Sequence, residues 1–207
     1  MPEPEPQNDS IIDVEERLTT PDMPDIDWEN KNFPPCFPKM HFDLHALEGR
    51  FKTFCQRCYW GFVTITLYTI LNIIMNMFQF AFKRSSTMRF IFSLTVNPFL
   101  MVTSFYCFYI GYKAVVYDNK KLKLYMIIEL VLLTICVCAF VFDLLNFDGI
   151  IRLVDVFKRK HYIFGISIFF ELTVLGFGIF TRIMCLIQAF TWRKKQVLDS
   201  GLTADDK

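Results

Sequence analysis

Residues 59–82 read YWGFVTITLYTILNIIMNMFQFAF and contain no charged side chain. An α-helix rises about 1.5 Å per residue, so roughly 20 apolar residues cross the hydrocarbon of a bilayer. Three further apolar runs of similar length follow, at 90–112, 124–147 and 163–190. Only a helix satisfies every backbone hydrogen bond within such a run. The sequence therefore predicts an all-α, multi-pass membrane protein with a bundle of four transmembrane helices.

The overall composition agrees with a membrane protein. Of the 207 residues, 53% are hydrophobic, and 24 Phe stand against 8 Gly, which makes the apolar mass bulkier than that of an average soluble domain. We find no phosphate-binding loop, no Gly-rich nucleotide motif and no arrangement of nucleophile and base. We therefore expect neither an enzyme nor a bound cofactor, and no nucleic-acid partner.

The charges are distributed unevenly along the chain. Residues 1–30 hold ten acids and one base, a net charge of −9, which leaves +10 for the remainder. We interpret 1–30 as a disordered acidic tail, because prolines and repelling acids leave too little apolar surface for a core. No basic region followed by an apolar stretch marks a cleavable signal peptide. The balance of bases between the two sides favours cytosolic termini, with 196–207 as a second cytosolic tail.

Residues 31–58 form the entrance to the first span. Prolines predict an extended or turn conformation at its start. Apolar residues then recur at helical spacing, as in Leu44, Leu47, Phe51 and Phe54. We expect a short amphipathic helix that lies in the membrane interface before the first span of the 59–195 domain. The alternative is an ordinary extension of the first helix.

Three charged residues lie well inside the predicted spans. Glu129 belongs to the third run, and Glu171 and Arg182 belong to the fourth. A charge at the bilayer centre costs roughly 2.5–3.5 kcal/mol on insertion scales, so partners are expected. Glu129 and Arg182 have similar depths, which predicts an interhelical ion pair, and Glu171 lies three turns from Arg182 on the same helix face. These residues either clamp the helices together or line an ion or proton path. Asp143, near the edge of the third run, can reach the interface.

The loop between the second and third spans is basic. It carries Lys113, Lys120, Lys121 and Lys123. Lysines beside an anionic leaflet contribute roughly 1 kcal/mol each to lipid binding. The alternative is that these lysines only set the topology. The third loop, 148–162, mixes apolar and charged residues and is expected to lie along the membrane surface.

Two cysteines adjoin the first span. Cys55 and Cys58 are juxtamembrane thiols, which makes them candidates for palmitoylation. Packing is the alternative, and the spacing of nearby ligands matches no standard zinc finger, so no metal site is expected. Residues 97–99 read Asn-Pro-Phe, the peptide that endocytic adaptors bind. Because they fall inside the second run, we interpret Pro98 as a helix kink.

The entrance segment resembles a known family. Residues 31–44 read KNFPPCFPKMHFDL. They are similar to the N-W/F-P-P-x-x-P motif that precedes the first of four helices in secretory carrier membrane proteins. Phe33, Pro34 and Pro35 occupy the centre of this motif, and the resemblance implies that they set the angle of the entrance helix.

The end of the second span is also similar to that family. Residues 107–114, CFYIGYKA, stand where the family has the aromatic peptide C-W-Y-R-P-x-Y-K/R-A. The family links this peptide to phosphoinositide binding and membrane fusion. Here Ile110 and Gly111 replace the Arg and Pro, and the peptide is one residue shorter. Without that Arg, phosphoinositide binding stays open here, and the loop lysines are candidates to substitute for it. Tyr109 and Tyr112 are expected at the interface.

The resemblance implies a protein of post-Golgi and endosomal recycling vesicles that acts in exocytosis and endocytosis. Its expected partners are membrane lipids, including anionic or phosphoinositide lipids, and trafficking proteins, with a homo- or hetero-oligomer open. The expected location is the trans-Golgi, recycling endosomes, secretory vesicles or the plasma membrane. Two other functions stay open: a small channel or transporter that uses Glu129, Glu171 and Arg182, and a membrane subunit of a larger assembly.

Overall fold

The protein is described here by a computed structural model. Its described residues are 31–34, 41–45, 47, 49–83, 85–116, 121–143 and 147–205, with side chains up to 194 except at 116. The chain divides into two compact units, Met1–Leu47 and Glu48–Lys207.

The first unit contains the Pro-rich entrance segment. Asn32 closes a loop with Phe42 through two hydrogen bonds, one from Asn32 Nδ2 to the Phe42 carbonyl (3.1 Å) and one from the Phe42 amide to Asn32 Oδ1 (2.7 Å). The rings of Phe33 and Phe42 lie 5.4 Å apart. Asn32 and Phe33 of the entrance motif therefore hold a local loop together. Pro35 lies outside the described residues.

The second unit is helical. Its helices are α2 (Gly49–Ala81), α3 (Thr87–Val116), α4 (Lys121–Val141), α5 (Ile150–Lys158) and α6 (Tyr162–Asp205). The four longer ones, all but α5, are long and apolar enough to cross a membrane. This confirms the prediction of an all-α, four-span membrane protein.

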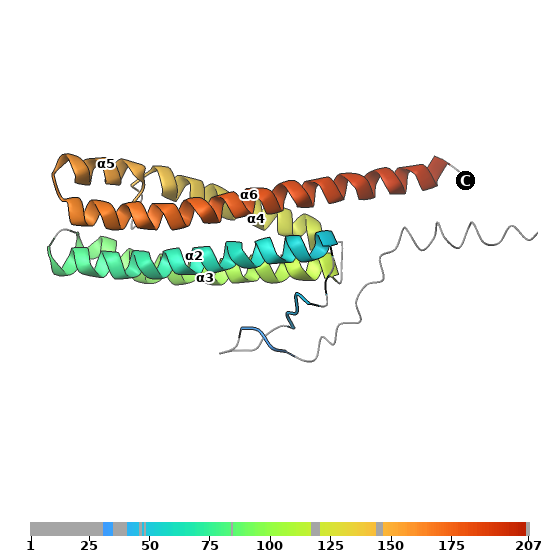
Figure 1. Ribbon diagram of the computed structural model, residues 1–207, viewed down its shortest axis with the longest axis horizontal. Helices are drawn as coiled ribbons and strands as arrows, with labels where there is room; N and C mark the ends of the chain where they lie inside the picture. The colour runs from blue at the N-terminus through green and yellow to red at the C-terminus, as the bar shows by residue number, and fades with distance from the viewer. Residues whose placement is uncertain are drawn as a thin grey trace, which may run out of the picture. The chain divides into compact units, whose positions relative to one another are not determined.

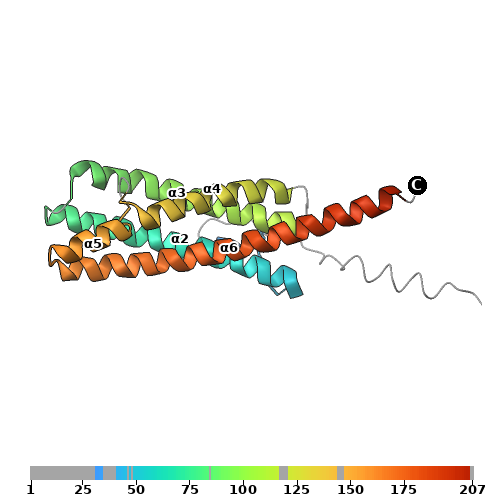
Figure 2. The ribbon, with the colours of Figure 1, turned by 90° about the horizontal axis from the view of Figure 1, so that it is seen from above.

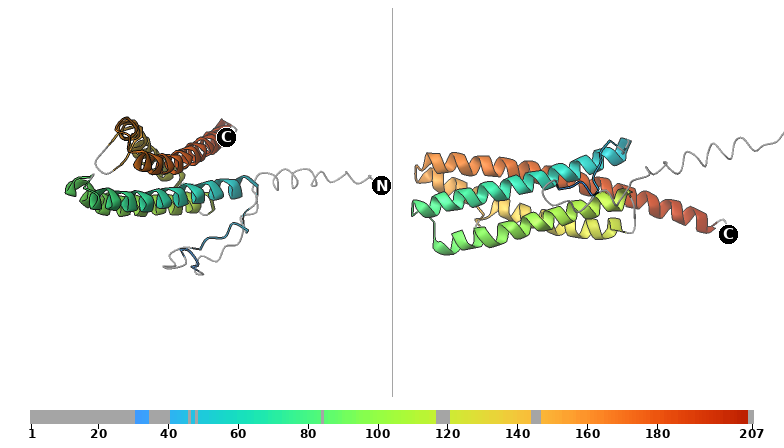
Figure 3. Two further views of the ribbon diagram at one scale, coloured as in Figure 1. Left: turned by 60° about the vertical axis from the view of Figure 1, so that its left-hand side comes forward. Right: turned by 90° about the horizontal axis from the view of Figure 1, so that it is seen from below.

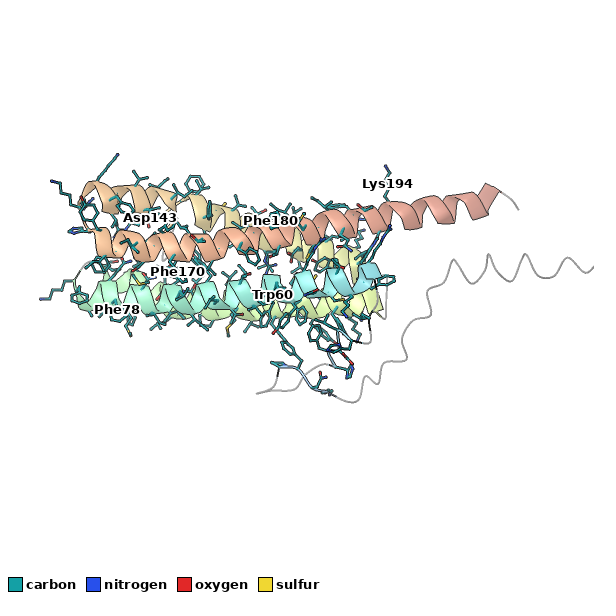
Figure 4. All side chains as sticks on the ribbon, viewed as in Figure 1. Trp60, Phe78, Asp143, Phe170, Phe180 and Lys194 are labelled. Carbon is teal, nitrogen blue, oxygen red and sulfur yellow. The ribbon has the colours of Figure 1, made fainter. Side chains whose placement is uncertain are left out.

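The four spans form an antiparallel bundle. α2 packs against α3 and α6, and α4 packs against the same two helices (Figures 1 and 2). The right-hand view of Figure 3 shows the spans lying lengthwise beside one another. We call the end where α3 leads into α4 the α3–α4 end, and the end that holds α5 and the α2–α3 turn the α5 end. Figure 4 labels Asp143 towards the α5 end and Lys194 towards the α3–α4 end.

The bundle exposes many large apolar residues on its outside and buries many polar residues inside. Phe99 is 72% exposed and Ile163 is 80% exposed, although both are large and apolar. Asn72, Asn97 and Glu171 are at most 1% exposed. In water such a surface would cause aggregation, whereas lipid solvates it at no cost. This distribution of polarity is what a bilayer environment requires.

The first helix differs from the expectation at its start. α2 begins at Gly49, whose φ of +53° suits glycine, and it runs without interruption through Ala81. Residues 49–58, expected as part of a separate interfacial helix, are thus the first turns of the span itself. The residues described between 41 and 47 are not helical. The alternative of a juxtamembrane extension is the better description, because nothing in residues 49–81 breaks the helix.

The third helix ends earlier than its apolar run. The sequence indicates a span to 147, but α4 ends at Val141. Beyond it, Arg89 Nη2 donates to the Phe147 carbonyl (3.1 Å), and Gln79 Nε2 donates to Asp148 Oδ2 (2.9 Å). These tertiary bonds replace the helical ones, and non-helical backbone at such a position is tolerated when protein groups satisfy it.

A short helix, α5, occupies the loop that was expected to lie along the membrane surface. Val156 packs against Ile168 and Leu172 of α6, while Ile151 and Val154 face outward. In Figure 1 α5 lies alongside the first part of α6. The last helix also exceeds its apolar run, since α6 continues to Asp205 through part of the expected C-terminal tail.

Candidate lipid-binding face and buried polar sites

The α3–α4 end of the bundle gathers basic side chains. All of the following are at least partly exposed: Arg50, Lys52, Arg57, Lys113, Lys121, Lys123, Arg193 and Lys194. We call these eight residues the basic face. Among the bundle side chains described at this end, the one acid is Glu129, which lies deeper and is paired. At the α5 end the bases Lys83, Arg89, Arg152, Lys158, Arg159 and Lys160 are accompanied by Asp143, Asp148 and Asp155. The basic face is therefore the more strongly cationic end among the described side chains.

The two tyrosines expected at the interface lie in different surroundings. Tyr109 is partly exposed, and Lys113 Nζ lies 3.3 Å from its hydroxyl and 5.6 Å from its ring centre. Tyr112 is fully buried and packs near Phe108, with ring centres 6.5 Å apart. The expectation of Tyr112 as an interfacial contact is thus wrong, because its side chain points into the bundle.

Gly111 has a packing role at the same place. A Cβ on this residue would lie 2.8 Å from Cε2 of Tyr125, whose ring is 1% exposed. Tyr125 has no room to retreat, so the glycine lets α3 and α4 approach closely. The replacement of a family proline by glycine therefore has a local structural reason.

The loop lysines are only partly described. Lys121 is half-buried and Lys123 is exposed at the first turn of α4. Lys120 lies outside the described residues. The described lysines of this loop are thus placed at one edge of the basic face.

Glu129 and Arg182 form the ion pair expected from their depths. Arg182 Nη1 lies 2.6 Å from Glu129 Oε2, and both side chains are 4% exposed. Arg182 Nη2 also donates to Ser104 Oγ (2.5 Å), and the Cys107 thiol donates to Glu129 Oε2 (2.9 Å). α3, α4 and α6 are therefore joined at one level inside the bundle.

Glu171 does not belong to this pair. It accepts a hydrogen bond from Asn72 Nδ2 (3.1 Å) and is separated from Arg182 by eleven residues, about 16 Å along α6. Between the two levels, by position along the four helices, lie the buried side chains of Ile65, Leu100, Leu132 and Leu175, which we call the apolar layer. The buried Thr64 hydroxyl lies beside Gly178 at about the same height. Grouping Glu171 with Glu129 and Arg182 as one ion-paired site is therefore wrong, although both α6 charges face the interior as expected.

A second polar cluster fills the α5 half of the bundle. Its centre is Arg89, which contacts Asp143 Oδ1 (2.8 Å), Asp148 Oδ1 (2.5 Å) and Asn76 Oδ1 (3.3 Å). Asn76 Nδ2 donates to Asn72 Oδ1 (3.1 Å), which joins the cluster to Glu171. Asp143 is thus held by Arg89 and does not simply reach for the interface.

Asp148 is the most deeply buried acid of the linker between α4 and α5. Burial raises the pKa of Asp148 above its usual value, while the Arg89 guanidinium opposes the rise. Its ionisation therefore depends on Arg89. The sequence contains a signal for this cluster. The three amide side chains of the run 59–82, Asn72, Asn76 and Gln79, recur at steps of four and three residues, which places them on one face of a helix.

Comparison with known families identifies the chain. The model of the SCAMP family matches residues 30–196, most of the sequence. The chain belongs to the SCAMP family. No match was found among curated proteins or among solved structures. Family membership assigns the protein to membrane trafficking in general, and the family is not known for enzymatic activity.

In this SCAMP family member the juxtamembrane cysteines are not available for acylation. Cys55 is 0% and Cys58 is 6% exposed. The Cys58 sulfur lies 3.6 Å from that of Cys185 and 3.4 Å from the Tyr125 hydroxyl. An acyltransferase needs an accessible thiol, so palmitoylation at these positions disagrees with the structure. Packing, the other interpretation, is the one that the structure supports.

Proposed function

We propose that this SCAMP family member is a carrier-vesicle protein of the post-Golgi and endosomal recycling system. It acts in exocytosis and endocytosis by binding lipids and trafficking proteins, and it turns over no substrate. The basic face lies at the cytosolic leaflet and contacts anionic headgroups there, phosphoinositides included. Both chain termini are then cytosolic.

The observation that carries this proposal is the basic face itself. Lys113, Lys121 and Lys123 come from the ends of α3 and α4, and Arg193 and Lys194 come from α6. Each basic residue near an anionic leaflet contributes about 1 kcal/mol, so several acting together retain such lipids at physiological salt. Because bases near the spans favour the cytosolic side, the same face supports the orientation.

Tyr109 and Lys113 are the part of the family peptide best placed to contact headgroups. The ammonium of Lys113 lies over the Tyr109 ring, so the phenol supports it beside the bilayer surface. This pair and the neighbouring lysines stand in for the Arg that the family has where this chain has Ile110. Lipid binding at this place therefore depends on several cations and not on one.

The channel alternative receives less support from the buried charges. Glu129 and Arg182 neutralise each other at 2.6 Å, and the apolar layer separates them from Glu171. Charged groups that conduct ions across a membrane are expected to line a water-filled route. A clamp that fixes α3, α4 and α6 is the simpler role for the pair.

The test compares two matched double substitutions in the full chain. Lys121→Glu with Lys123→Glu reverses two charges on the basic face, and Lys158→Glu with Lys160→Glu reverses two at the α5 end. In nanodiscs that contain a fluorescent phosphoinositide, energy transfer from the protein should fall at least severalfold for the first pair only. In cells, co-localisation with a recycling cargo should be lost for the same pair. Equal effects of both pairs, or no effect of either, would contradict the proposal.

A further inference from the structure

Three polar side chains from three helices meet inside the α5 half of the bundle. Asn72 of α2 donates to Glu171 Oε2 of α6 (3.1 Å), and Asn97 Nδ2 of α3 donates to Asn72 Oδ1 (2.9 Å). Asn72 and Asn97 are 0% and Glu171 is 1% exposed. The Glu171 carboxyl group is therefore enclosed in protein and held by a neutral amide.

Two acceptor oxygens of this group of three are left without a donor. Glu171 Oε1 and Asn97 Oδ1 are buried and have no hydrogen-bond partner among the described residues. An enclosed acceptor without a donor is costly, and a carboxylate more so than an amide. The Tyr68 hydroxyl, which lies near Glu171, is also buried without a hydrogen-bond partner among the described residues. A proton on the Glu171 carboxyl group would remove the charge of the carboxylate and turn one of its oxygens into a donor.

The bases that form ion pairs in this region already have acidic partners other than Glu171. Towards the α5 end three bases oppose three acids in the described ion pairs: Arg89, Arg152 and Arg159 against Asp143, Asp148 and Asp155. An ionised Glu171 would add one uncompensated negative charge inside the bundle. A buried charge without a partner is neutralised by protonation in preference to being retained.

The groups near Glu171 come from every neighbouring element. α2 contributes the Tyr68 hydroxyl, α3 contributes Arg89, and the linker after α4 contributes Asp148. α4 itself contributes the Cys136 thiol, which lies near Tyr68. Arg89, the cation of this set, is shared between two aspartates, so it does not serve as a counterion in contact with Glu171.

A polar route leads from the α5 end to this carboxyl group. It begins at a cavity of about 70 Å³ lined in part by Gln79, Arg152 and His161. Gln79 is bonded to Asp148, and Arg89 joins Asp148 to Asn76, which is bonded to Asn72. On the other side of Glu171 the buried side chains of the apolar layer separate it from the Glu129–Arg182 level. The polar side chains therefore connect Glu171 to the α5 end.

We propose that Glu171, held by Asn72 and Asn97, is a proton-binding site that is reached only from the α5 end. A hydronium ion at that end gives its proton to the carboxylate, so one O–H bond of the hydronium breaks, a water molecule is left, and the O–H bond of a neutral carboxylic acid forms. In the orientation of the proposed function, on which this last step rests, the site responds to the pH of the vesicle lumen.

Infrared difference spectroscopy of the full chain in nanodiscs tests the site independently of orientation. On acidification the wild type should gain, among the bands of its protonated carboxyl groups, one that shifts in heavy water and that belongs to Glu171. The band should be absent in Glu171→Gln and present in the control Asp155→Asn, which changes a partly exposed acid of α5. Labelling of the glutamates with heavy carbon should shift the band in the wild type, which requires no variant. A wild type without the band, or a Glu171→Gln protein that keeps it, would overturn the proposal.

Proton flux into proteoliposomes tests the closed end of the route. The wild type and Glu171→Gln should give equal, background flux, because the apolar layer stops the proton at Glu171. A flux that Glu171→Gln abolishes would overturn one-sided access and show a transport path.

Discussion

The two buried polar clusters of this bundle stabilise charged side chains inside the protein in different ways. Near the α3–α4 end, Glu129 and Arg182 neutralise each other, and Ser104 and Cys107 add hydrogen bonds. Near the α5 end, a longer network built on Arg89 and amides extends to Glu171 and leaves acceptors without donors. The first cluster is compact and has paired its charges, as a structural clamp requires. The second has capacity for one further proton, as a binding site requires.

The two clusters also differ in the backbone that positions them. The Glu129–Arg182 pair lies on intact helices, so its position is set by regular backbone geometry. The Arg89 cluster includes the carbonyl of Phe147, in the linker where α4 gives way to α5. Because that linker depends on side chains for its hydrogen bonds, the α5 half is the part of the bundle more easily altered by protonation.

The largest expected effect comes from breaking the compact pair. Glu129→Gln or Arg182→Met should lower the free energy of unfolding by about 3–5 kcal/mol, because each leaves a buried charge alone. Denaturant titration in mixed micelles measures the loss. Exchanging the two charges, Glu129→Arg with Arg182→Glu, should restore a large part of it. No rescue by the exchange would show that the pair does not act as a unit.

Removing the centre of the longer network should cost somewhat less. Arg89→Met leaves Asp143 without its cation and Asp148 with only the more distant Arg152 (3.8 Å), at a cost of about 2–3 kcal/mol. Lys83→Met, an exposed neighbour, is the control. The loss should shrink as the pH falls. Burial holds the pKa of Asp148 above its unfolded value of about 3.9, so the folded variant binds a proton more readily than the unfolded chain does. A loss that grows on acidification would contradict this assignment.

Single hydrogen bonds should also separate the two clusters. Ser104→Ala removes a bond to the charged Arg182 and should cost about 1.5–3 kcal/mol. Asn97→Leu removes one neutral bond together with an unpaired acceptor, and should cost about 1 kcal/mol or less. Thermal unfolding in nanodiscs compares them. The opposite order would mean that hydrogen bonds contribute more to stability in the network than at the ion pair.

The smallest effect is expected from a disulfide cross-link between α2 and α6. The sulfurs of Cys58 and Cys185 lie 3.6 Å apart, close enough for mild iodine oxidation to join them with small shifts. Cleavage in the α3–α4 loop followed by non-reducing electrophoresis should show the two halves linked, with stability almost unchanged. Cys138→Ser should leave the cross-link intact and Cys185→Ser should abolish it. Failure of the wild type to cross-link would place these helices in a different register.

The spans were predictable because a transmembrane helix needs one simple feature, a run of apolar residues long enough to cross the bilayer. The Glu129–Arg182 contact was also predictable, since two opposite charges at matching depths have few other partners. The end of α4 was not, because Arg89 and Gln79, distant in sequence, compete for the backbone and side chains of residues 147–148. The role of Asn72 and Asn97 could not be predicted either. Neutral amides do not stand out in an apolar run as charged residues do, and their hydrogen-bond partners lie on neighbouring helices.

The entrance segment shows a similar limit. The apolar spacing of residues 44–58 suits a helix in the interface, but it also suits the first turns of a span, and only packing decides between them. In the structure Phe54 packs edge-on against Tyr125 of α4, with ring centres 5.5 Å apart. A contact of this kind draws the segment into the bundle, and sequence periodicity does not report it.

The most direct test of the account is the sidedness of the two ends. Single cysteines at Lys123 on the basic face and at Lys158 on α5 would be introduced into a tagged full chain and exposed to a membrane-impermeant maleimide. After selective permeabilisation of the plasma membrane, the account predicts labelling at 123 alone, with 158 labelled only once internal membranes are opened. Labelling in the reverse order would contradict a cytosolic basic face, and with it the proposed lipid contacts.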